Sequence, residues 1–182
     1  GLMLGHDPWS QPIATVGGAI STDGVGYLAA IHGSMGDQVI GVEAVFPTGD
    51  DLDARAISIR AGSRLDLVVV GAEGTLGVIT AATLRVFPRP VAFSVHAVGF
   101  ASFAAGFAAV GAMARAGVQP SMVDLTEEDD GSGRFETTLY LAFQGTPEIE
   151  RVLTSAGLGL CRENGGRVLK QNIATEFWEK RH

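Results

Sequence analysis

The 182-residue sequence is poor in cysteine, basic residues and charge: it has one cysteine, 13 Lys and Arg, and 18% charged residues. The single cysteine, Cys161, excludes an internal disulfide framework and a cysteine-rich metal site. With 20 Asp and Glu, the formal net charge is −7. The chain therefore lacks the basic surface typical of proteins that bind nucleic acid or anionic membranes. Its apolar runs are also shorter than the roughly 20 residues of a membrane-spanning helix.

Apolar residues and glycine are plentiful. Hydrophobic residues make up 46% of the chain, which argues against disorder and is enough for one large core or two small ones. The 25 glycines amount to about twice the usual frequency. Pro88 and Pro90 stiffen the chain after a strand-like run. We therefore expect one domain over residues 1–90 and another over residues 91–182.

The second half reads as the β-α-β-β-α-β order of a ferredoxin-like fold. Strands are expected at 91–99, 120–126, 135–143 and 167–171, with an acidic turn over 126–134. Ser102 precedes a helix that ends at Gly117, and Thr146-Pro147 begins a helix that stops at Gly165-Gly166. Alternation predicts that one strand face is formed by Thr137, Leu139, Leu141 and Phe143. Helical spacing predicts two apolar stripes: Phe103, Phe107, Val110 and Ala114, and Ile149, Val152, Leu153, Ala156 and Leu160. We assign Cys161 and the Phe103/Phe107 stripe to the core.

The first half is α+β, with strands expected at 39–46, 67–70 and 78–87 and a tight turn at 47–50. Two glycine-rich segments, 15–26 and 71–77, could bring backbone N–H groups close to a ligand, and a helix starting near Gly17 would favour an anion. Neither segment has the Rossmann or Walker spacing. Taken alone, the first segment is more simply explained by close packing of a helix on a sheet, and the second by an ordinary glycine-rich turn.

Taken together, the two segments carry a resemblance. Five motifs follow one another in a fixed order over residues 6–90. They are Asp7-Pro8-Trp9-Ser10, Ala14-Thr15-Val16-Gly17-Gly18, Gly33 with Asp37, VIGVEAVFPTGD, and GAEGTLGVITAATLRVFPRP. This resembles the PCMH-type FAD-binding domain of the vanillyl-alcohol-oxidase superfamily. Within it, the chain is most similar to the branch of alkyldihydroxyacetonephosphate synthase and the D-lactate, glycolate and D-2-hydroxyglutarate dehydrogenases.

The resemblance implies FAD as the cofactor and a set of binding residues. Residues 8–15 would line the flavin and pyrophosphate, 22–25 would follow the cofactor, and 73–79 would hold its adenosine side. The implied cofactor-binding residues are Pro8, Trp9, Ser10, Ala14, Thr15, Gly17, Gly18, Thr22, Gly24, Glu73, Gly74, Thr75, Gly77, Val78 and Ile79.

By the same resemblance, residues 91–182 are the first part of a ferredoxin-like cap domain over the substrate side of the flavin. Trp178 and Arg181 match a W-x-x-R stretch, which makes Arg181 a substrate-side candidate. Asp124 stands where relatives near the synthase tend to have Arg, and a carboxylate there would repel an anionic substrate group.

The remaining polar residues predict no further site. His6, His32, His96 and His182 have no metal-ligand spacing, and we assign them structural or exposed positions; no metal is expected. The acidic run Glu127, Glu128, Asp129 and Asp130 reads as a solvated turn. No Ser-His-Asp or Cys-His arrangement is indicated.

The sequence therefore predicts part of an FAD-dependent oxidoreductase that oxidises a small 2-hydroxy acid or related alcohol. An FAD-dependent transferase like the synthase and a truncated, non-catalytic module are the alternatives. Since relatives are much longer, we expect an internal fragment that alone retains FAD poorly, with its catalytic residues elsewhere. A small-molecule substrate, a cytoplasmic location and no nucleic-acid partner are expected, and homo-oligomerisation is left open.

Overall fold

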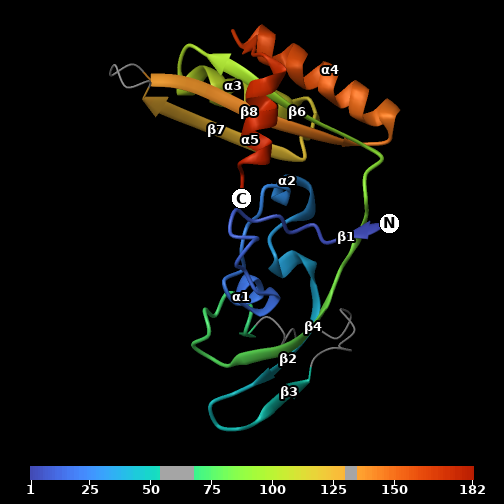
Figure 1. Cartoon of the computed structure of the whole chain (residues 1–182), viewed down its shortest axis with the longest axis vertical. Coiled ribbons are helices and arrows are strands. Elements are labelled where there is room, and N and C mark those ends of the chain that lie inside the picture. The colour runs from blue at the N-terminus through green and yellow to red at the C-terminus, as the bar shows by residue number, and fades with distance from the viewer. Residues whose placement is uncertain (54–67, 130–134) are drawn as a thin grey trace. The chain divides into compact units, whose positions relative to one another are not determined.

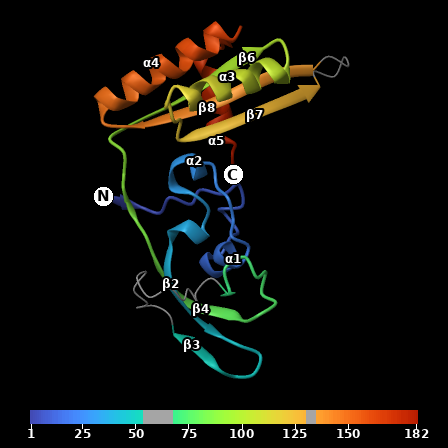
Figure 2. The same ribbon diagram turned by 180° about the vertical axis from the view of Figure 1, so that it is seen from behind.

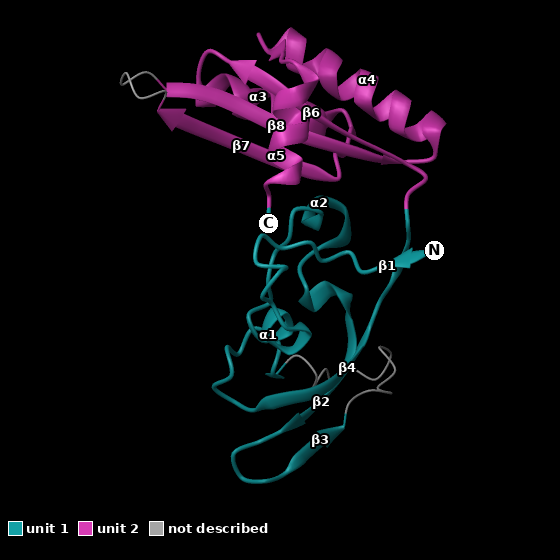
Figure 3. Cartoon of the chain, in the orientation of Figure 1, with its two compact units in different colours: residues 1–89, 182 teal, residues 90–181 magenta. Residues whose placement is uncertain are grey.

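We describe the fold from a computed structural model, which covers residues 1–53, 68–129 and 135–182. The chain divides into two compact units, Gly1–Arg89 together with His182, and Pro90–Arg181 (Figure 3). Each unit has its own hydrophobic core. Both combine helices with antiparallel sheet, which confirms the predicted α+β class.

The first unit is built on a three-stranded sheet in the order β3-β2-β4. The central strand β2 (Val39–Val45) pairs antiparallel with β3 (Asp51–Asp53) and with β4 (Val78–Leu84). The predicted turn between β2 and β3 is present, and Phe46 N–H donates to the Asp50 carbonyl at 2.9 Å. This hairpin was predictable because Pro, Gly and Asp favour reversals.

A second strand pair joins the two ends of this unit. The short strands β1 (Leu2–Met3) and β5 (Phe87–Pro88) pair antiparallel. Gln38 is fully buried beside them, and its side-chain oxygen accepts from Gly5 N–H at 3.1 Å. The expected strand over 78–87 is therefore divided between β4 and β5.

The helices of the first unit are short: α1 (Val16–Ser21), α2 (Ala29–His32) and the 3-10 turn η1 (Gly36–Gln38). Thr15 caps α1, its hydroxyl oxygen accepting from Gly18 N–H at 3.0 Å. α1 buries Ala19 and Ile20 in a core that also contains Met35, Val39, Val42, Ala44 and Val69.

The predicted strand over 67–70 is wrong for residues 68–70, and Leu67 lies outside the described residues. Residues 68–70 form a turn, although Val69 is buried in the core. The chain turns because Gly71, with a φ of +70°, donates its N–H to the Ile20 carbonyl at 3.1 Å. The apolar run therefore packs against α1 instead of joining the sheet.

The second unit has the predicted β-α-β-β-α-β order, and its sheet runs β7-β8-β6-β9. All its strand pairs are antiparallel. This is the ferredoxin-like arrangement expected from the sequence. Its elements are β6 (Ala92–Phe100), α3 (Phe103–Arg115), β7 (Met122–Asp129), β8 (Phe135–Gly145), α4 (Pro147–Glu163), β9 (Arg167–Val168) and α5 (Gln171–Glu179).

α3 and α4 cover one face of this sheet (Figures 1 and 2). The predicted face of β8 is buried here, and Cys161 packs in the same core, as expected. α4 approaches closely because Gly157 has no β-carbon: one would lie 2.5 Å from the Phe143 ring. The buried cluster consists of Val98, Ala109, Met113, Leu139, Leu141, Phe143, Leu158 and Cys161.

The predicted core stripe of α3 is wrong for both phenylalanines, although Val110 does pack against the core. Phe103 and Phe107 are 44% and 65% exposed, and the buried residues of α3 are Gly106, Ala109 and Met113. Small residues on the buried face let the helix backbone lie close to the sheet, where larger side chains would not fit. The α4 stripe is also partly wrong, since Ile149 and Val152 are exposed while Leu153 and Leu160 pack against the core.

Two further differences concern β7 and α5. Residues 127–129 of the predicted acidic turn belong to strand β7, and Asp130 lies outside the described residues. α5 was not expected from the sequence. It packs through aromatic contacts: Phe177 stacks on Tyr140 with ring centroids 3.9 Å apart, and Trp178 lies 4.8 Å from Phe93.

Candidate functional site

A pocket of about 370 Å³ lies in the first unit, between three short stretches of chain. The first stretch precedes α1, the second is α1 itself, and the third follows it. Most of the residues that line the pocket were predicted as cofactor-binding from the sequence. The lining consists of His6, Pro8, Trp9, Ser10, Ala14, Thr15, Gly18, Ala19, Thr22, Gly24 and Val25.

The walls of the pocket are held together by backbone contacts. Tyr27 N–H donates to the Asp7 carbonyl at 2.8 Å, and Met35 N–H donates to the Gly24 carbonyl at 2.8 Å. A β-carbon on Gly26 would lie 2.6 Å from the Asp7 nitrogen, so only glycine allows this approach. Residues about 20 positions apart in the sequence thus form one concave surface.

The pocket combines polar groups with exposed apolar side chains. Trp9 and Val25 are 71% and 70% exposed at the pocket. The Thr15 hydroxyl oxygen accepts from Gly18 N–H, and the Thr22 hydroxyl donates to the Gly18 carbonyl at 3.0 Å. These two hydroxyls therefore fix the shape of α1 as well as line the pocket.

The second glycine-rich segment lies next to α1 but outside the pocket lining. Glu73 N–H donates to the Ser21 carbonyl at 2.8 Å, and a β-carbon on Gly17 would lie 3.7 Å from the Ile79 carbonyl. The structure thus attaches the two glycine-rich segments to the same helix. The predicted residues that do not line the pocket are Gly17, Glu73, Gly74, Thr75, Gly77, Val78 and Ile79.

His6 was assigned a structural or exposed position from the sequence, but it forms part of the pocket wall. Its Nδ1 is buried and has no hydrogen-bond partner in the part of the chain that the structure describes. Burial lowers the pKa of His6, although Asp7 acts in the opposite direction. The sequence signal that could have found it is its position directly before the Asp7-Pro8 pair.

Metal-binding and nucleophilic side-chain arrangements among the described residues are a separate matter from the pocket. Within the described residues, no group of three or more His, Cys, Asp or Glu side chains is arranged to hold a metal ion. Ser94 and His96 do meet, with Oγ and Nε2 3.0 Å apart, and the Ser94 hydroxyl donates to Glu150. This is not a triad of the Ser-His-Asp type, because the carboxylate contacts the serine and not the histidine.

The second unit places Asp124 and Arg181 in different surroundings. Burial, with Glu128 nearby, raises the pKa of the Asp124 carboxyl, so the position disfavours further negative charge. The Arg181 guanidinium lies 3.6 Å from the centroid of the Trp178 ring and donates to the Trp178 carbonyl at 2.6 Å. The two members of the W-x-x-R stretch therefore contact each other directly.

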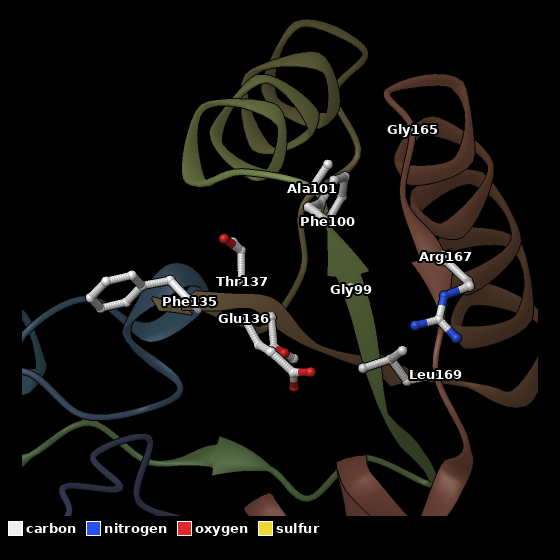
Figure 4. Close-up of a pocket in the computed structure, with 10 residues that line it drawn as sticks. Gly99, Phe100, Ala101, Phe135, Glu136, Thr137, Gly165, Arg167 and Leu169 are labelled. Atoms are coloured by element: carbon white, nitrogen blue, oxygen red, sulfur yellow. The ribbon is translucent and has the colours of Figure 1, made fainter. Parts of the chain in front are cut away.

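A second pocket, of about 480 Å³, lies in the second unit where β6 ends beside β8 and β9 (Figure 4). Arg167 and Glu136 are its charged residues, and Phe100, Phe135 and Leu169 are its large apolar ones. No residue predicted as a site from the sequence lines it. The pocket of the first unit is therefore the better candidate.

Comparison with known proteins finds a family match over the part of the chain that contains this pocket. The FAD binding domain family matches residues 1–55. The chain is 37% identical to the mitochondrial D-lactate dehydrogenase [cytochrome] of Arabidopsis thaliana, over 91% of this chain and 31% of that protein. It is 30% identical to alkyldihydroxyacetonephosphate synthase of Dictyostelium discoideum (86% and 24%). It is 28% identical to an uncharacterized FAD-linked oxidoreductase of Escherichia coli strain K12 (84% and 33%).

Solved structures agree in fold. A structure of alkyldihydroxyacetonephosphate synthase superposes with a TM-score of 0.83 at 24% identity, over all of this chain and 40% of that one. The chain spans about a third or less of the length of these curated relatives. In the described part of the chain, no helix is long and apolar enough to span a membrane.

Proposed function

We propose that this chain is part of an FAD-dependent enzyme, because the FAD binding domain family matches residues 1–55 and the similar proteins include an FAD-linked oxidoreductase and a D-lactate dehydrogenase. Residues 1–90 contribute to its FAD-binding domain, and residues 91–182 form the first part of its substrate-covering cap. The observation that carries the proposal is the pocket around α1, lined largely by residues that the resemblance assigns to FAD.

The pocket fits part of a dinucleotide. Gly18 and Gly24 leave the backbone open to a ligand, Ser10 offers a hydroxyl, and the exposed Trp9 offers an apolar ring surface. His6 adds an imidazole edge to the same wall, beside Gly24. Bound FAD would supply hydride and electron transfer, while this chain supplies binding and orientation.

The loop 71–77 is the second part of the proposed site. It lies next to α1 but does not line the pocket. Glu73 and Gly74 have positive φ angles of 50° and 76°, which turn the exposed loop back onto α1. By the resemblance, Gly17 also binds the cofactor, and the adenosine side of FAD is held by Glu73, Gly74, Thr75, Gly77, Val78 and Ile79.

We propose a small 2-hydroxy acid or related alcohol as the substrate. The similarity to D-lactate dehydrogenase along 91% of the chain supports it. The presence of Asp124 supports it as well, because a negative charge there repels the two charges of a phosphate group more strongly than the single charge of a 2-hydroxy acid. Arg181 is the substrate-side candidate, and the other catalytic groups are expected outside this chain.

A transferase like alkyldihydroxyacetonephosphate synthase is the second candidate, favoured by the similarity to that enzyme over 86% of this chain.

Stopped-flow absorbance of the whole protein with bound FAD tests the substrate. We expect D-lactate, D-2-hydroxyglutarate or glycolate to bleach the flavin. Bleaching by none of them, in protein that retains FAD, would exclude the hydroxy-acid substrate and leave the transferase. Arg181→Gln should raise KM, whereas Arg162→Gln, on the exposed side of α4, should not.

A further inference from the structure

His6 presents one ring nitrogen to protein and the other to the side of the pocket. Nδ1 is buried without a partner in the described part of the chain. Nε2 and Cε1 lie beside Gly24, where a β-carbon would be 3.5 and 3.2 Å from them. Gly24 and His6 both line the pocket, so this edge of the ring belongs to the pocket wall.

The ring is neutral near pH 7, because burial lowers the pKa of His6 from 6.5. A neutral imidazole carries one N–H donor and one acceptor nitrogen. Unpaired N–H groups are rarer in protein interiors than acceptors that lack a partner. The favoured tautomer therefore leaves Nδ1 as the bare acceptor and places the proton on Nε2.

Of the two threonine hydroxyls in the pocket wall, only that of Thr22 already donates its proton. Thr15 accepts from Gly18 N–H, and Thr22 donates its proton to the Gly18 carbonyl. The His6 N–H, like the hydroxyls of Ser10 and Thr15, is therefore a donor at the pocket wall that has no acceptor among the described residues. FAD presents phosphate, carbonyl and ring-nitrogen acceptors, which match such a donor.

We propose that His6 is a cofactor-binding residue whose Nε2–H donates a hydrogen bond to bound FAD. This inference rests on the proposed function, because it takes FAD to be the ligand of the pocket. It differs from a packing role in one respect: removing the ring nitrogens should weaken FAD binding without weakening the protein that lacks FAD.

The test compares three variants of the whole protein. In His6→Gln the amide nitrogen reaches the place of Nε2, in His6→Asn it reaches the place of Nδ1, and His6→Phe keeps the ring shape alone. FAD affinity is measured by flavin fluorescence titration, and stability by thermal unfolding of the FAD-free protein. We expect His6→Phe and His6→Asn to raise the Kd for FAD roughly tenfold or more. The Kd of His6→Gln should stay close to that of the unaltered protein. The FAD-free His6→Phe variant should unfold at no lower a temperature than the unaltered protein.

The outcomes separate the two proposals. If the unaltered protein does not bind FAD, the proposed function fails and this inference fails with it. If the unaltered protein binds FAD and the Asn variant binds it with the same affinity as the Gln variant, only the role of His6 is overturned. The Gln and Asn comparison holds even if the Phe variant does not fold.

Discussion

The backbone of Asp7 passes so close to Gly26 that a β-carbon on Gly26 would lie 2.6 Å from the Asp7 nitrogen and 2.8 Å from its carbonyl carbon. Both obstructing atoms belong to the main chain, so no side-chain rotation can relieve the contact. This approach brings the stretch before α1 next to the stretch after it, and the candidate pocket lies between them.

Gly26→Ala should therefore separate the pocket walls. We expect a loss of about 1–3 kcal/mol in the free energy of unfolding and weaker FAD binding by the whole protein. Urea unfolding and fluorescence titration measure the two effects. Gly159→Ala is the control: no atom lies within 4 Å of its β-carbon position in α4, so it should be neutral or stabilise by up to about 1 kcal/mol. Equal stability of the two variants would contradict the argument.

The orientation of α3 can be tested with two alanine substitutions. Met113 is 1% exposed and packs in the core, whereas Phe107 is 65% exposed. Met113→Ala should cost about 2–5 kcal/mol of stability, and Phe107→Ala less than about 1 kcal/mol. Chemical denaturation of each variant gives the comparison. A larger loss for Phe107→Ala would restore the orientation predicted from the sequence.

The thiol of Cys161 should be unreactive in the folded protein. It is fully buried, and burial raises its pKa to about 11, so little of the reactive thiolate forms near neutral pH. We expect a thiol reagent at pH 8 to modify Cys161 only after a denaturant is added. Rapid modification under native conditions, followed by mass spectrometry, would show that α4 opens.

Stability should fall as the pH falls below 6.5, partly because of His96. Burial lowers the pKa of His96 in the folded state, against a smaller opposite effect of Glu150. The unfolded chain, with a pKa near 6.5, then takes up the proton first. Stability is fully present above pH 6.5 and decreases until the lower folded-state pKa is passed. Urea midpoints at several pH values should show a shallower decrease for His96→Gln than for the unaltered chain; an identical slope would rule out this contribution.

The ferredoxin-like half could be predicted because its signals are local. Alternation along Thr137 to Phe143 marks a buried strand face, and Thr146-Pro147 marks a helix start by capping chemistry. The side of α3 that faces the core could not be predicted from the spacing of large apolar residues. The helix backbone lies close to the sheet, so small residues such as Gly106 and Ala109 occupy the buried face. Val69 shows the same limit, since its burial depends on a turn held by α1.

The sequence could predict most of the residues that belong to the candidate site, but it could not predict which of them lie next to each other in space. The glycine-rich segments and the Asp7-Pro8 motif indicated FAD, yet no pattern showed that His6 would lie beside Gly24. That contact depends on the backbone approach at Gly26, which joins segments separated in the sequence. The side-chain neighbours of α5 were missed for a similar reason, because they come from strands far upstream.

The acidic residues on strands β3 and β7 have a consequence for self-association. Among the described strands, each of these lies at an edge of its sheet, where one row of backbone groups can pair with a foreign strand. Asp51 and Asp53 are on β3, and Glu127, Glu128 and Asp129 are on β7. A second copy that added a strand in register would bring like charges together. Like-charge repulsion at these two strands should therefore disfavour the pairing of a second copy with either of them.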